Sequence, residues 1–387
     1  MIPAARYAAA IDVLDQINAG EPAEKALTGW GRANRFAGSK DRAAVRDHVF
    51  DVLRQKRSLA ALGGGTSGRA LVLGLLRRQQ INPNDVFGAG GYAPTALTAD
   101  EVAAGDVAHG AAALDLPDWL WPQWLADLGE DAEAVAHVLQ QRGPVTLRVN
   151  LRRGTRDAAI VALAADGVTA VPMNEVKTAL QVTENPRRLR NSGVFTDGLV
   201  ELQDVASQAA ITALEIAPDA RVLDYCAGGG GKALAIADMH GARVSAHDIS
   251  VARMGDIPVR AGRAGVRVEV IAPNELDPSA RFDCVVCDAP CSGSGTWRRA
   301  PEAKWAISSA KMQEYKALQQ KVIAKSSAFV GPSGTLFYAT CSVLACENEG
   351  IVDAFLDAHT DFRLLRSNWR LPDADGDGFY FAILQRA

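Results

Sequence analysis

The sequence has no Lys or Arg between residues 81 and 141, a stretch that carries ten Asp and Glu residues. It has no cysteine before Cys226, and no run of the roughly 18 to 20 apolar residues needed to cross a bilayer. The opening residues also lack the continuous apolar core of a signal peptide. These absences argue against a disulfide-stabilised secreted domain and against a membrane protein. We therefore expect a cytoplasmic chain with reduced thiols and no membrane partner.

The charge is unevenly distributed, although the formal net charge is only −4. Residues 1–80 carry 13 Lys and Arg against 7 acids, and residues 142–190 carry 9 against 4. Two basic segments thus flank the acidic one. This pattern is typical of proteins that contact nucleic acid, while the simpler alternative is a set of solvated helix faces in an arginine-rich sequence.

The hydrophobic spacing divides the chain into three regions. Residues 1–140 have apolar positions three and four apart, which is typical of helices, and end in the acidic, loop-rich segment. Residues 141–200 contain short strands around one helix and predict a small α+β module. In residues 201–387, apolar strand-like runs alternate with helical stretches, the βαβ signature of a doubly wound sheet. The predicted fold class is α/β, with a Rossmann-like domain preceded by the α+β module and an all-helical domain.

The segment RVLDYCAGGGGKALAIADMH predicts a strand, a glycine turn and a helix. Backbone N–H groups at the start of such a helix can approach a ligand closely. The spacing is neither a G-x-G-x-x-G fingerprint nor a P-loop. The next strand ends at Asp248, twenty residues beyond Gly228, where a carboxylate can accept hydrogen bonds from ribose hydroxyls. These features favour an adenosine-containing cofactor. The residues expected to bind it around the turn are Asp224, Cys226, Ala227, Gly228, Gly229, Gly230, Gly231 and Lys232.

Two of the six cysteines lie where strands of the predicted sheet end. The segment FDCVVCDAPCSGSG places Asp288 and Cys291 at one such end, and GTLFYATCSVLACENEG places Cys341 at another. Because doubly wound sheets build their sites at this edge, two thiols and a carboxylate can converge beside the cofactor. The alternative is a metal site at Cys284 and Cys287, but side chains three apart in a strand point to opposite faces. We therefore expect no bound metal.

Three segments closely resemble the Sun-type family of RNA cytosine-5 methyltransferases: DYCAGGGGK, FDCVVCDAPCSGSGTWRRAPEAKW and LFYATCSVLACENEGIVDAFL. The resemblance spans residues 142–387 and includes LRVN, ELQDVASQ and DGFYFAILQR in the same order. The segment GSKDRAAVRDHVFDVLRQKRSLA is similar to the NusB-type RNA-binding domain of bacterial small-subunit rRNA methylases. The resemblance implies S-adenosylmethionine as cofactor and methylation of cytosine in RNA. The implied substrate is 16S rRNA or a small-subunit assembly intermediate, and a monomer is the default expectation.

The family's chemistry assigns a role to each residue at the predicted strand ends. Carbon 5 of cytosine is a poor nucleophile, and covalent addition at carbon 6 makes it reactive. By resemblance, Cys341 is the attacking thiol, Asp288 hydrogen-bonds the base, and Cys291 assists removal of the carbon-5 proton. Cys341 then needs a lowered pKa, since an ordinary thiol with a pKa of about 8.5 is mostly protonated at pH 7. Lys232 matches a family lysine near the substrate pocket. The positions that match the family's cofactor contacts are Asp224, Gly230 and Asp248, and Asp288 is also expected to bind the cofactor.

The sequence departs from the family pattern at two places. Gly228 and Gly229 stand where the family usually has Ala and Pro, and the segment VEVIAPNELD lacks the expected acid after the third strand of the large domain. Asn274 or a backbone amide is then left to contact the adenine.

Beyond the cysteine loop, Arg298, Arg299 and Lys304 are expected to hold a splayed RNA strand, with packing of the following helix as the alternative.

Three other functions stay open at this point. A DNA cytosine-5 methyltransferase would use Cys291, in its Pro-Cys pair, as the nucleophile. A tRNA methyltransferase would share the whole mechanism with the rRNA enzyme. A non-catalytic RNA-binding assembly factor would keep the fold without the reaction, which the presence of Asp288, Cys291 and Cys341 disfavours.

Overall fold

A computed structural model describes residues 1–387, which form two compact units. Unit 1 comprises Met1–Arg142 and Trp297–Ser309, and unit 2 comprises Gly143–Thr296 and Ala310–Ala387. The sequence-based scheme assigned residues 297–309 to the methyltransferase domain. In the structure they pack with the N-terminal helices, so the chain leaves unit 2 once and returns to it.

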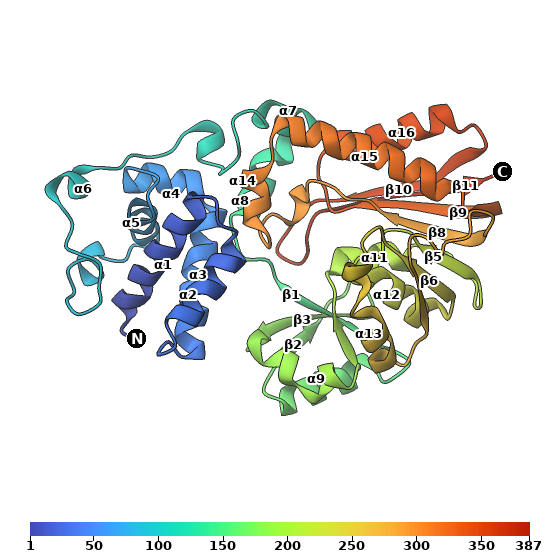
Figure 1. Ribbon diagram of the computed structural model, residues 1–387, viewed down its shortest axis with the longest axis horizontal. Coiled ribbons are helices and arrows are strands. Elements are labelled where there is room, and N and C mark those ends of the chain that lie inside the picture. Colours follow the sequence, from blue (N-terminus) through green and yellow to red (C-terminus); the bar gives the residue numbers. More distant parts are fainter. The chain divides into compact units, whose positions relative to one another are not determined.

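Unit 1 is built from helices, and those of residues 3–78 surround one apolar core (Figure 1, blue to cyan, with α14 in orange). Its helices are α1 (Pro3–Asn18), α2 (Ala23–Ala33), α3 (Ser39–Arg54), α4 (Lys56–Gly63), α5 (Gly68–Arg78), α6 (Ala99–Ala103), α7 (Trp121–Leu128), α8 (Ala132–Leu139) and α14 (Pro301–Ala306), with 3-10 turns η1 (Pro83–Asp85), η2 (Gly110–Ala112) and η3 (Gly129–Asp131). Val13, Val49 and Leu71 of α1, α3 and α5 are fully buried in that core. No single helix is long and apolar enough to cross a membrane, and only α4 and α5 together, bent by 91°, pass that test of length and composition.

The segment 297–309 completes the C-terminal end of α3. The last carbonyls of a helix have no partner within the helix. Lys304 Nζ donates to the carbonyl of Arg54, the final residue of α3, at 2.9 Å, and Arg54 Nε donates to the carbonyl of Arg298 at 2.6 Å. The Trp297 ring stacks on Trp124 with centroids 6.0 Å apart.

These contacts correct the expectation that Arg298 and Lys304 bind RNA. Their exposed fractions are 2% and 1%, so neither side chain is accessible to RNA. Arg299 is exposed and stays a candidate for that role.

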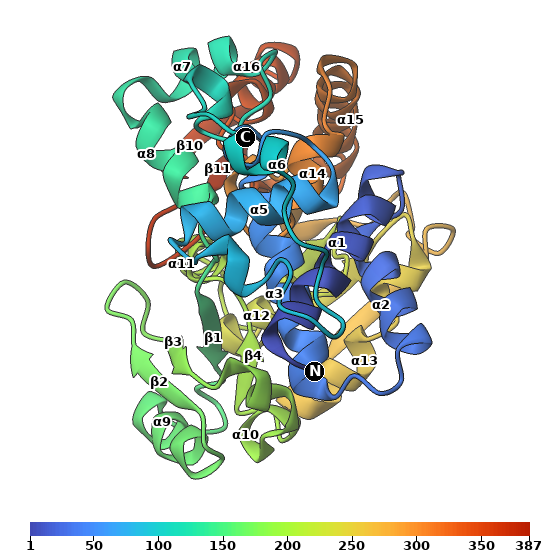
Figure 2. The same ribbon diagram turned by 90° about the vertical axis from the view of Figure 1, so that its left-hand side faces the viewer.

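Unit 2 begins with a small antiparallel sheet of order β2-β3-β1-β4. Its elements are β1 (Val145–Val149), α9 (Arg156–Ala165), β2 (Thr169–Pro172), β3 (Ala179–Glu184), η4 (Pro186–Asn191), α10 (Gly193–Thr196) and β4 (Val200–Leu202). Figure 2 shows α9 and α10 beside this sheet, and Ala159 and Leu163 of α9 are buried against Leu147 and Leu180 of the strands. This is the small α+β module predicted from short strands around one helix.

The larger sheet of unit 2 has seven strands in the order β10-β11-β9-β8-β5-β6-β7. The strands from β9 to β7 are parallel, whereas β11 and β10 add an antiparallel edge. The elements in chain order are α11 (Val205–Thr212), β5 (Arg221–Asp224), α12 (Gly231–His240), β6 (Arg243–His247), η5 (Val251–Met254), α13 (Ile257–Ala264), β7 (Val268–Ile271), β8 (Phe282–Asp288), η6 (Ser294–Thr296), α15 (Ser309–Ser327), β9 (Val330–Thr340), η7 (Ala345–Glu347), α16 (Glu349–Ala358), β10 (Phe362–Arg370) and β11 (Phe379–Arg386).

Helices cover both faces of this sheet (Figure 1). Residues of α11, α12 and α13, such as Ile211, Ile236 and Ile257, form one core against the strands. Residues of α15 and α16, such as Ile323 and Phe355, form a second core on the opposite face. The doubly wound, Rossmann-like fold predicted from the alternating pattern is therefore confirmed, and its carboxyl edge is the expected place for a site.

Candidate active site

A cavity of about 770 Å³ lies at the carboxyl ends of β5, β6, β8 and β9 in unit 2. This volume is in the range of pockets that hold nucleotide-sized ligands. The sequence-predicted residues that line it are Asp224, Cys226, Ala227, Gly228, Gly229, Gly231, Lys232, Asp248, Asp288, Cys291 and Cys341. Gly230 and Asn274 do not line it. Asn274 is exposed, and its neighbour Pro273 is the residue of that loop that borders the cavity, so the proposed adenine contact through Asn274 is not supported by its position.

The glycine turn between β5 and α12 depends on two residues with positive φ. Gly228 has φ of +52° and Gly230 has φ of +79°, in the region that side chains other than glycine rarely adopt. A Cβ at Gly230 would lie 2.7 Å from Cγ1 of Ile257. Gly230 therefore packs against Ile257 and fixes the backbone of the turn without lining the cavity. Its neighbours Gly229 and Gly231 line the cavity.

Asp248 holds this turn from the end of β6. Its Oδ2 accepts the Gly228 N–H at 2.9 Å, and its Oδ1 accepts the Ser250 N–H at 2.9 Å. The Arg253 guanidinium lies 3.0 Å from the same Oδ2. Since a carboxylate has about four lone-pair positions, Asp248 retains capacity to accept from a ligand hydroxyl.

Asp224 is a buried carboxylate at the bottom of the cavity, with an exposed fraction of 1%. Neither of its oxygens has a hydrogen-bond partner in the structure. Burial, reinforced by the nearby Asp288 carboxylate, raises the pKa of Asp224 to about 7. A buried carboxylate without a partner is costly, so its place in a cavity wall indicates a ligand that brings a cationic or hydrogen-bonding group.

Lys232 and Asp288 form an ion pair between the glycine turn and the cysteine loop. Lys232 Nζ lies 2.6 Å from Asp288 Oδ2 and 5.0 Å from the centre of the Phe379 ring. Burial acts to lower the pKa of Lys232, but Asp288 outweighs this effect and the pKa is raised. Lys232 therefore stays charged and fixes the Asp288 carboxylate at the edge of the cavity.

The two predicted catalytic cysteines meet in the same cavity. Cys291 Sγ and Cys341 Sγ are 3.5 Å apart, and Thr296 Oγ1 lies 3.9 Å from Cys341 Sγ. A hydrogen bond from the Cys291 thiol lowers the pKa of Cys341, against the opposing effects of burial and of Asp288. The same hydrogen bond raises the pKa of Cys291 well above its ordinary value. The pair thus has one thiol that ionises easily, Cys341, and one that keeps its proton, Cys291.

Three further cysteines lie in or beside these strands: Cys226 just after β5, and Cys284 and Cys287 within β8. Cys284 packs in the core beneath α12 and Cys287 in the core beneath α15, so the two sulfurs point to opposite faces of β8. Burial raises the pKa of Cys284 to about 12. Cys226 lines the cavity, but its hydrogen bond with Cys287 and its burial raise its pKa, so it stays protonated.

The sequence analysis did not predict the residues that form one wall of the cavity. It consists of Leu318, Lys321, Val322 and Lys325 of α15. These positions follow the spacing of one helix face, so a helical-wheel analysis of α15 groups them, but nothing in the sequence shows which face meets the cavity. Gln203 and Ser207, from the ELQDVASQ segment, complete the lining beside the glycine turn.

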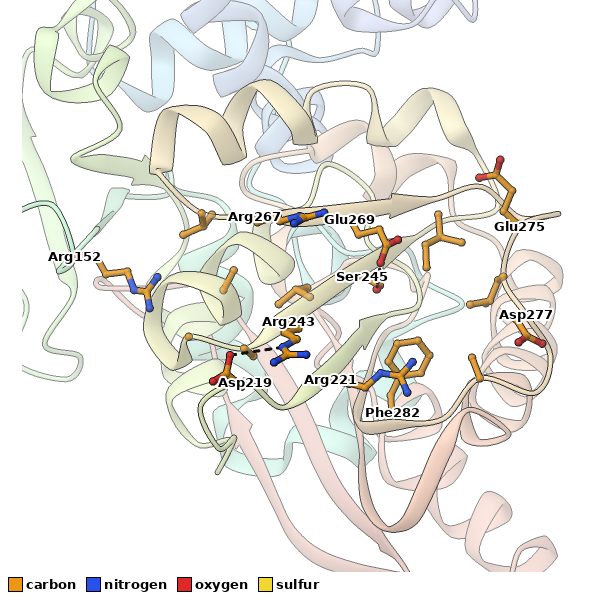
Figure 3. A pocket seen from close by; sticks show the side chains of 18 residues that line it. Arg152, Asp219, Arg221, Arg243, Ser245, Arg267, Glu269, Glu275, Asp277 and Phe282 are labelled. Carbon is orange, nitrogen blue, oxygen red and sulfur yellow. Dashed lines mark hydrogen bonds and ion pairs between the residues drawn. The ribbon is translucent and has the colours of Figure 1, made fainter.

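A second cavity, of about 700 Å³, lies at the opposite, amino-terminal edge of the parallel strands (Figure 3). Both arginines and carboxylates line its wall, and Arg243 faces Asp219 at 3.6 Å. No residue predicted to bind cofactor or act in catalysis lines it. The cavity at the carboxyl edge is therefore the candidate active site.

Comparisons with known proteins agree with this fold and site. Residues 211–384 match the family of 16S rRNA methyltransferases RsmB/F, and residues 116–187 match the ferredoxin-like domain of RsmF/B-like methyltransferases. The ribosomal RNA small subunit methyltransferase B of Xylella fastidiosa is 34% identical over 291 residues, which cover 69% of each chain. The chain belongs to the RsmB/F family. Methyltransferases of this family use S-adenosylmethionine as the methyl donor, and the resemblance to Sun-type enzymes is confirmed.

Other RsmB/F relatives and a solved structure extend the comparison. The ribosomal RNA small subunit methyltransferase B of Erwinia tasmaniensis is 33% identical over 285 residues, or 69% of this chain. The match spans 66% of the length of that relative. The crystal structure of PH0851 has a TM-score of 0.76 at 22% identity and covers 100% of this chain and 99% of that chain. At this identity the structural likeness shows the shared fold.

Proposed function

We propose that this RsmB/F protein methylates carbon 5 of a cytosine in RNA, with 16S rRNA or a small-subunit assembly intermediate as the substrate. The observation that carries the proposal is the pair of thiols 3.5 Å apart in a cavity that also holds a glycine turn and the Lys232–Asp288 ion pair. A nucleophile with a lowered pKa beside a thiol that keeps its proton fits covalent addition to the pyrimidine.

The residues of the cavity fit S-adenosylmethionine. The unpartnered Asp224 carboxylate suits the ammonium group of the methionine part, and Asp248 suits the ribose hydroxyls. Gly228 has φ of +52°, and a Cβ there would lie 2.9 Å from the Arg253 guanidinium, so glycine suits the turn that borders the cavity. When bound, the cofactor supplies an electrophilic methyl group.

The reaction begins at Cys341. Its thiolate adds to carbon 6, and the bond between sulfur and carbon forms as the ring takes up a proton at N3. The proton comes from the Lys232 ammonium by way of Asp288, which takes up the proton of their shared hydrogen bond as it protonates N3 and also accepts a hydrogen bond from the amino group of the base. The addition leaves carbon 5 as the electron-rich carbon of an enamine, which makes it the nucleophile for the methyl group.

Release requires a base at Cys291. While Cys341 is a thiolate, the hydrogen bond between the two sulfurs keeps the proton on Cys291. Once Cys341 is bonded to carbon, that hydrogen bond is lost, the pKa of Cys291 falls, and the Cys291 thiol releases its proton to solvent. The Cys291 thiolate then takes the carbon-5 proton, the bond between sulfur and carbon 6 breaks to restore the Cys341 thiolate, and N3 returns its proton through Asp288 to Lys232.

The target cytosine must leave its stack, because carbon 6 is not accessible in a helix. Lys321 and Lys325 of α15 are exposed at the rim of the cavity and replace Arg298 and Lys304 as candidate phosphate contacts.

The test is transfer of labelled methyl groups to unmodified small-subunit rRNA by the wild type, Cys341→Ala and Cys291→Ala. Cys346→Ala, which changes a half-buried cysteine outside the cavity, is the matched control. We expect labelled 5-methylcytosine with the wild type and with the control, no activity or adduct with Cys341→Ala, and a stable protein–RNA adduct with Cys291→Ala.

Other outcomes of this assay would support one of the alternative functions or an exchange of the two cysteine roles. Label that appears only in DNA or tRNA would change the substrate. An adduct that survives in Cys341→Ala and disappears in Cys291→Ala would exchange the two roles. No transfer to any nucleic acid would favour a non-catalytic assembly factor.

A further inference from the structure

Glu347 is a fully buried carboxylate that the proposed chemistry does not use. It ends the turn η7, has an exposed fraction of 0%, and does not line the cavity. Its Oε1 accepts the Ser292 N–H at 2.8 Å and the Gln319 Nε2–H at 3.0 Å. Its Oε2 accepts the Ser342 hydroxyl at 2.6 Å and the Ser292 hydroxyl. Each oxygen of the Glu347 carboxylate therefore accepts two hydrogen bonds.

The donors are not scattered through the fold. Ser292 directly follows Cys291, and Ser342 directly follows Cys341. One carboxylate thus receives three of its four hydrogen bonds from the residues next to the two reactive thiols. Gln319, the fourth donor, also donates to the carbonyl of Pro290 at 2.9 Å, on the other side of Cys291.

A second layer of hydrogen bonds joins the same two loops. The hydroxyls of Ser294 and Ser342 are 2.9 Å apart, and Ser294 Oγ accepts the Val343 N–H at 2.8 Å. The Gly295 N–H donates to the carbonyl of Cys341 at 2.9 Å. The loops after β8 and β9 are therefore fixed to each other on the side that faces away from the cavity.

We propose that Glu347 is a positioning residue that holds the loops of Cys291 and Cys341 at the separation at which one thiol can hydrogen-bond the other. A neutral or shorter side chain would leave hydroxyl and amide donors without their acceptor, and the loops would separate or rotate. The distance between the sulfurs would then increase, and Cys341 would lose the donor that favours its thiolate. The role in methyl transfer rests on the proposed function, whereas the effect on the thiol does not.

The first test measures the thiol alone, without RNA or cofactor. Iodoacetamide alkylation of Cys341 is followed by peptide mass spectrometry from pH 6 to pH 10 in the wild type and Glu347→Gln. We expect the alkylation rate of Cys341 at pH 7 to fall about tenfold and its pH midpoint to rise, because one hydrogen bond to the thiolate is lost. Glu347→Asp should recover part of the rate. Asp353→Asn, an exposed carboxylate change in α16, is the control and should leave the profile unchanged.

The second test separates positioning from general damage. In methyl transfer, Glu347→Gln should lower kcat at least about tenfold and leave the KM for S-adenosylmethionine close to that of the wild type. A merely structural role would change thermal stability without a shift in the Cys341 profile. If Glu347→Gln does not fold, the double variant Ser292→Ala and Ser342→Ala removes hydroxyl donors while keeping the carboxylate, and should shift the profile in the same direction.

A folded Glu347→Gln, or a folded double-serine variant, with the wild-type alkylation profile of Cys341 would overturn the proposal. Absence of methyl transfer in the wild type would refute the proposed function. The alkylation profile of Cys341 would still test the positioning role of Glu347, because that assay needs neither RNA nor cofactor.

Discussion

Replacement of Lys304 by methionine should change how the stability of unit 1 depends on pH. Burial lowers the pKa of Lys304 from its ordinary 10.5 to about 8, and Asp115 offsets only part of this effect. Below pH 8 the ammonium is charged in both the folded and the unfolded chain, so the folded state bears the full cost of burying it. Between pH 8 and 10.5 the folded state releases the proton first, and the free energy of unfolding rises with pH. From pH 7 to pH 9.5 the increase due to Lys304 is about 2 kcal/mol.

The assay for this prediction is urea unfolding monitored by tryptophan fluorescence. Six of the seven tryptophans lie in unit 1, so the emission reports mainly this unit. Between pH 7 and pH 9.5, the free energy of unfolding of the wild type should increase by about 2 kcal/mol more than that of Lys304→Met. The variant also loses the hydrogen bond to the Arg54 carbonyl, which lowers its stability equally at both pH values. If the free energy of unfolding depended on pH equally in both proteins, the claim that burial of the Lys304 ammonium destabilises the folded state would be refuted.

Three further changes test the cavity and the segment 297–309. Cofactor affinity, measured by calorimetry, should rise roughly tenfold from pH 6 to pH 8 in the wild type, because Asp224 with a pKa of about 7 must be ionised to bind a cation, and Asp224→Asn should show a flat profile. Gly230→Ala should weaken cofactor binding about tenfold or more through its strained positive φ, whereas Gly262→Ala, with open space at its Cβ, should bind normally. Trp297→Ala should destabilise unit 1 by about 3 to 5 kcal/mol in thermal unfolding followed by circular dichroism, and the partly exposed Trp119→Ala by less than about 1 kcal/mol.

The sequence predicted the alternating strands and helices of the large sheet, and the functional residues that lie at the ends of its strands. Alternating apolar runs are a local property, so the strands that end at Asp224, Asp248 and Asp288 were predictable, as was the convergence of Cys291 and Cys341 at one sheet edge. The likeness to a known family supplied the roles that spacing alone left open.

The failures have a common physical cause, which is tertiary packing between distant segments. Arg298 and Lys304 have the charge of RNA contacts, but only the folded chain shows that both are buried and that Lys304 completes the end of α3. Glu347 likewise has no local signal, since its donors lie up to 55 residues away. Asn274 was chosen by elimination in a loop, where periodicity gives no information.

The central claim is that Cys341 forms the covalent bond to carbon 6 of cytosine. The most direct measurement uses small-subunit rRNA transcribed with 5-fluorocytidine, which blocks loss of the carbon-5 substituent and traps the adduct in the presence of S-adenosylmethionine. Proteolysis and mass spectrometry then identify the attached peptide. The structure predicts a nucleotide attached to Cys341 in the wild type and no adduct in Cys341→Ala. Attachment at Cys291, or no adduct with an active enzyme, would contradict the account.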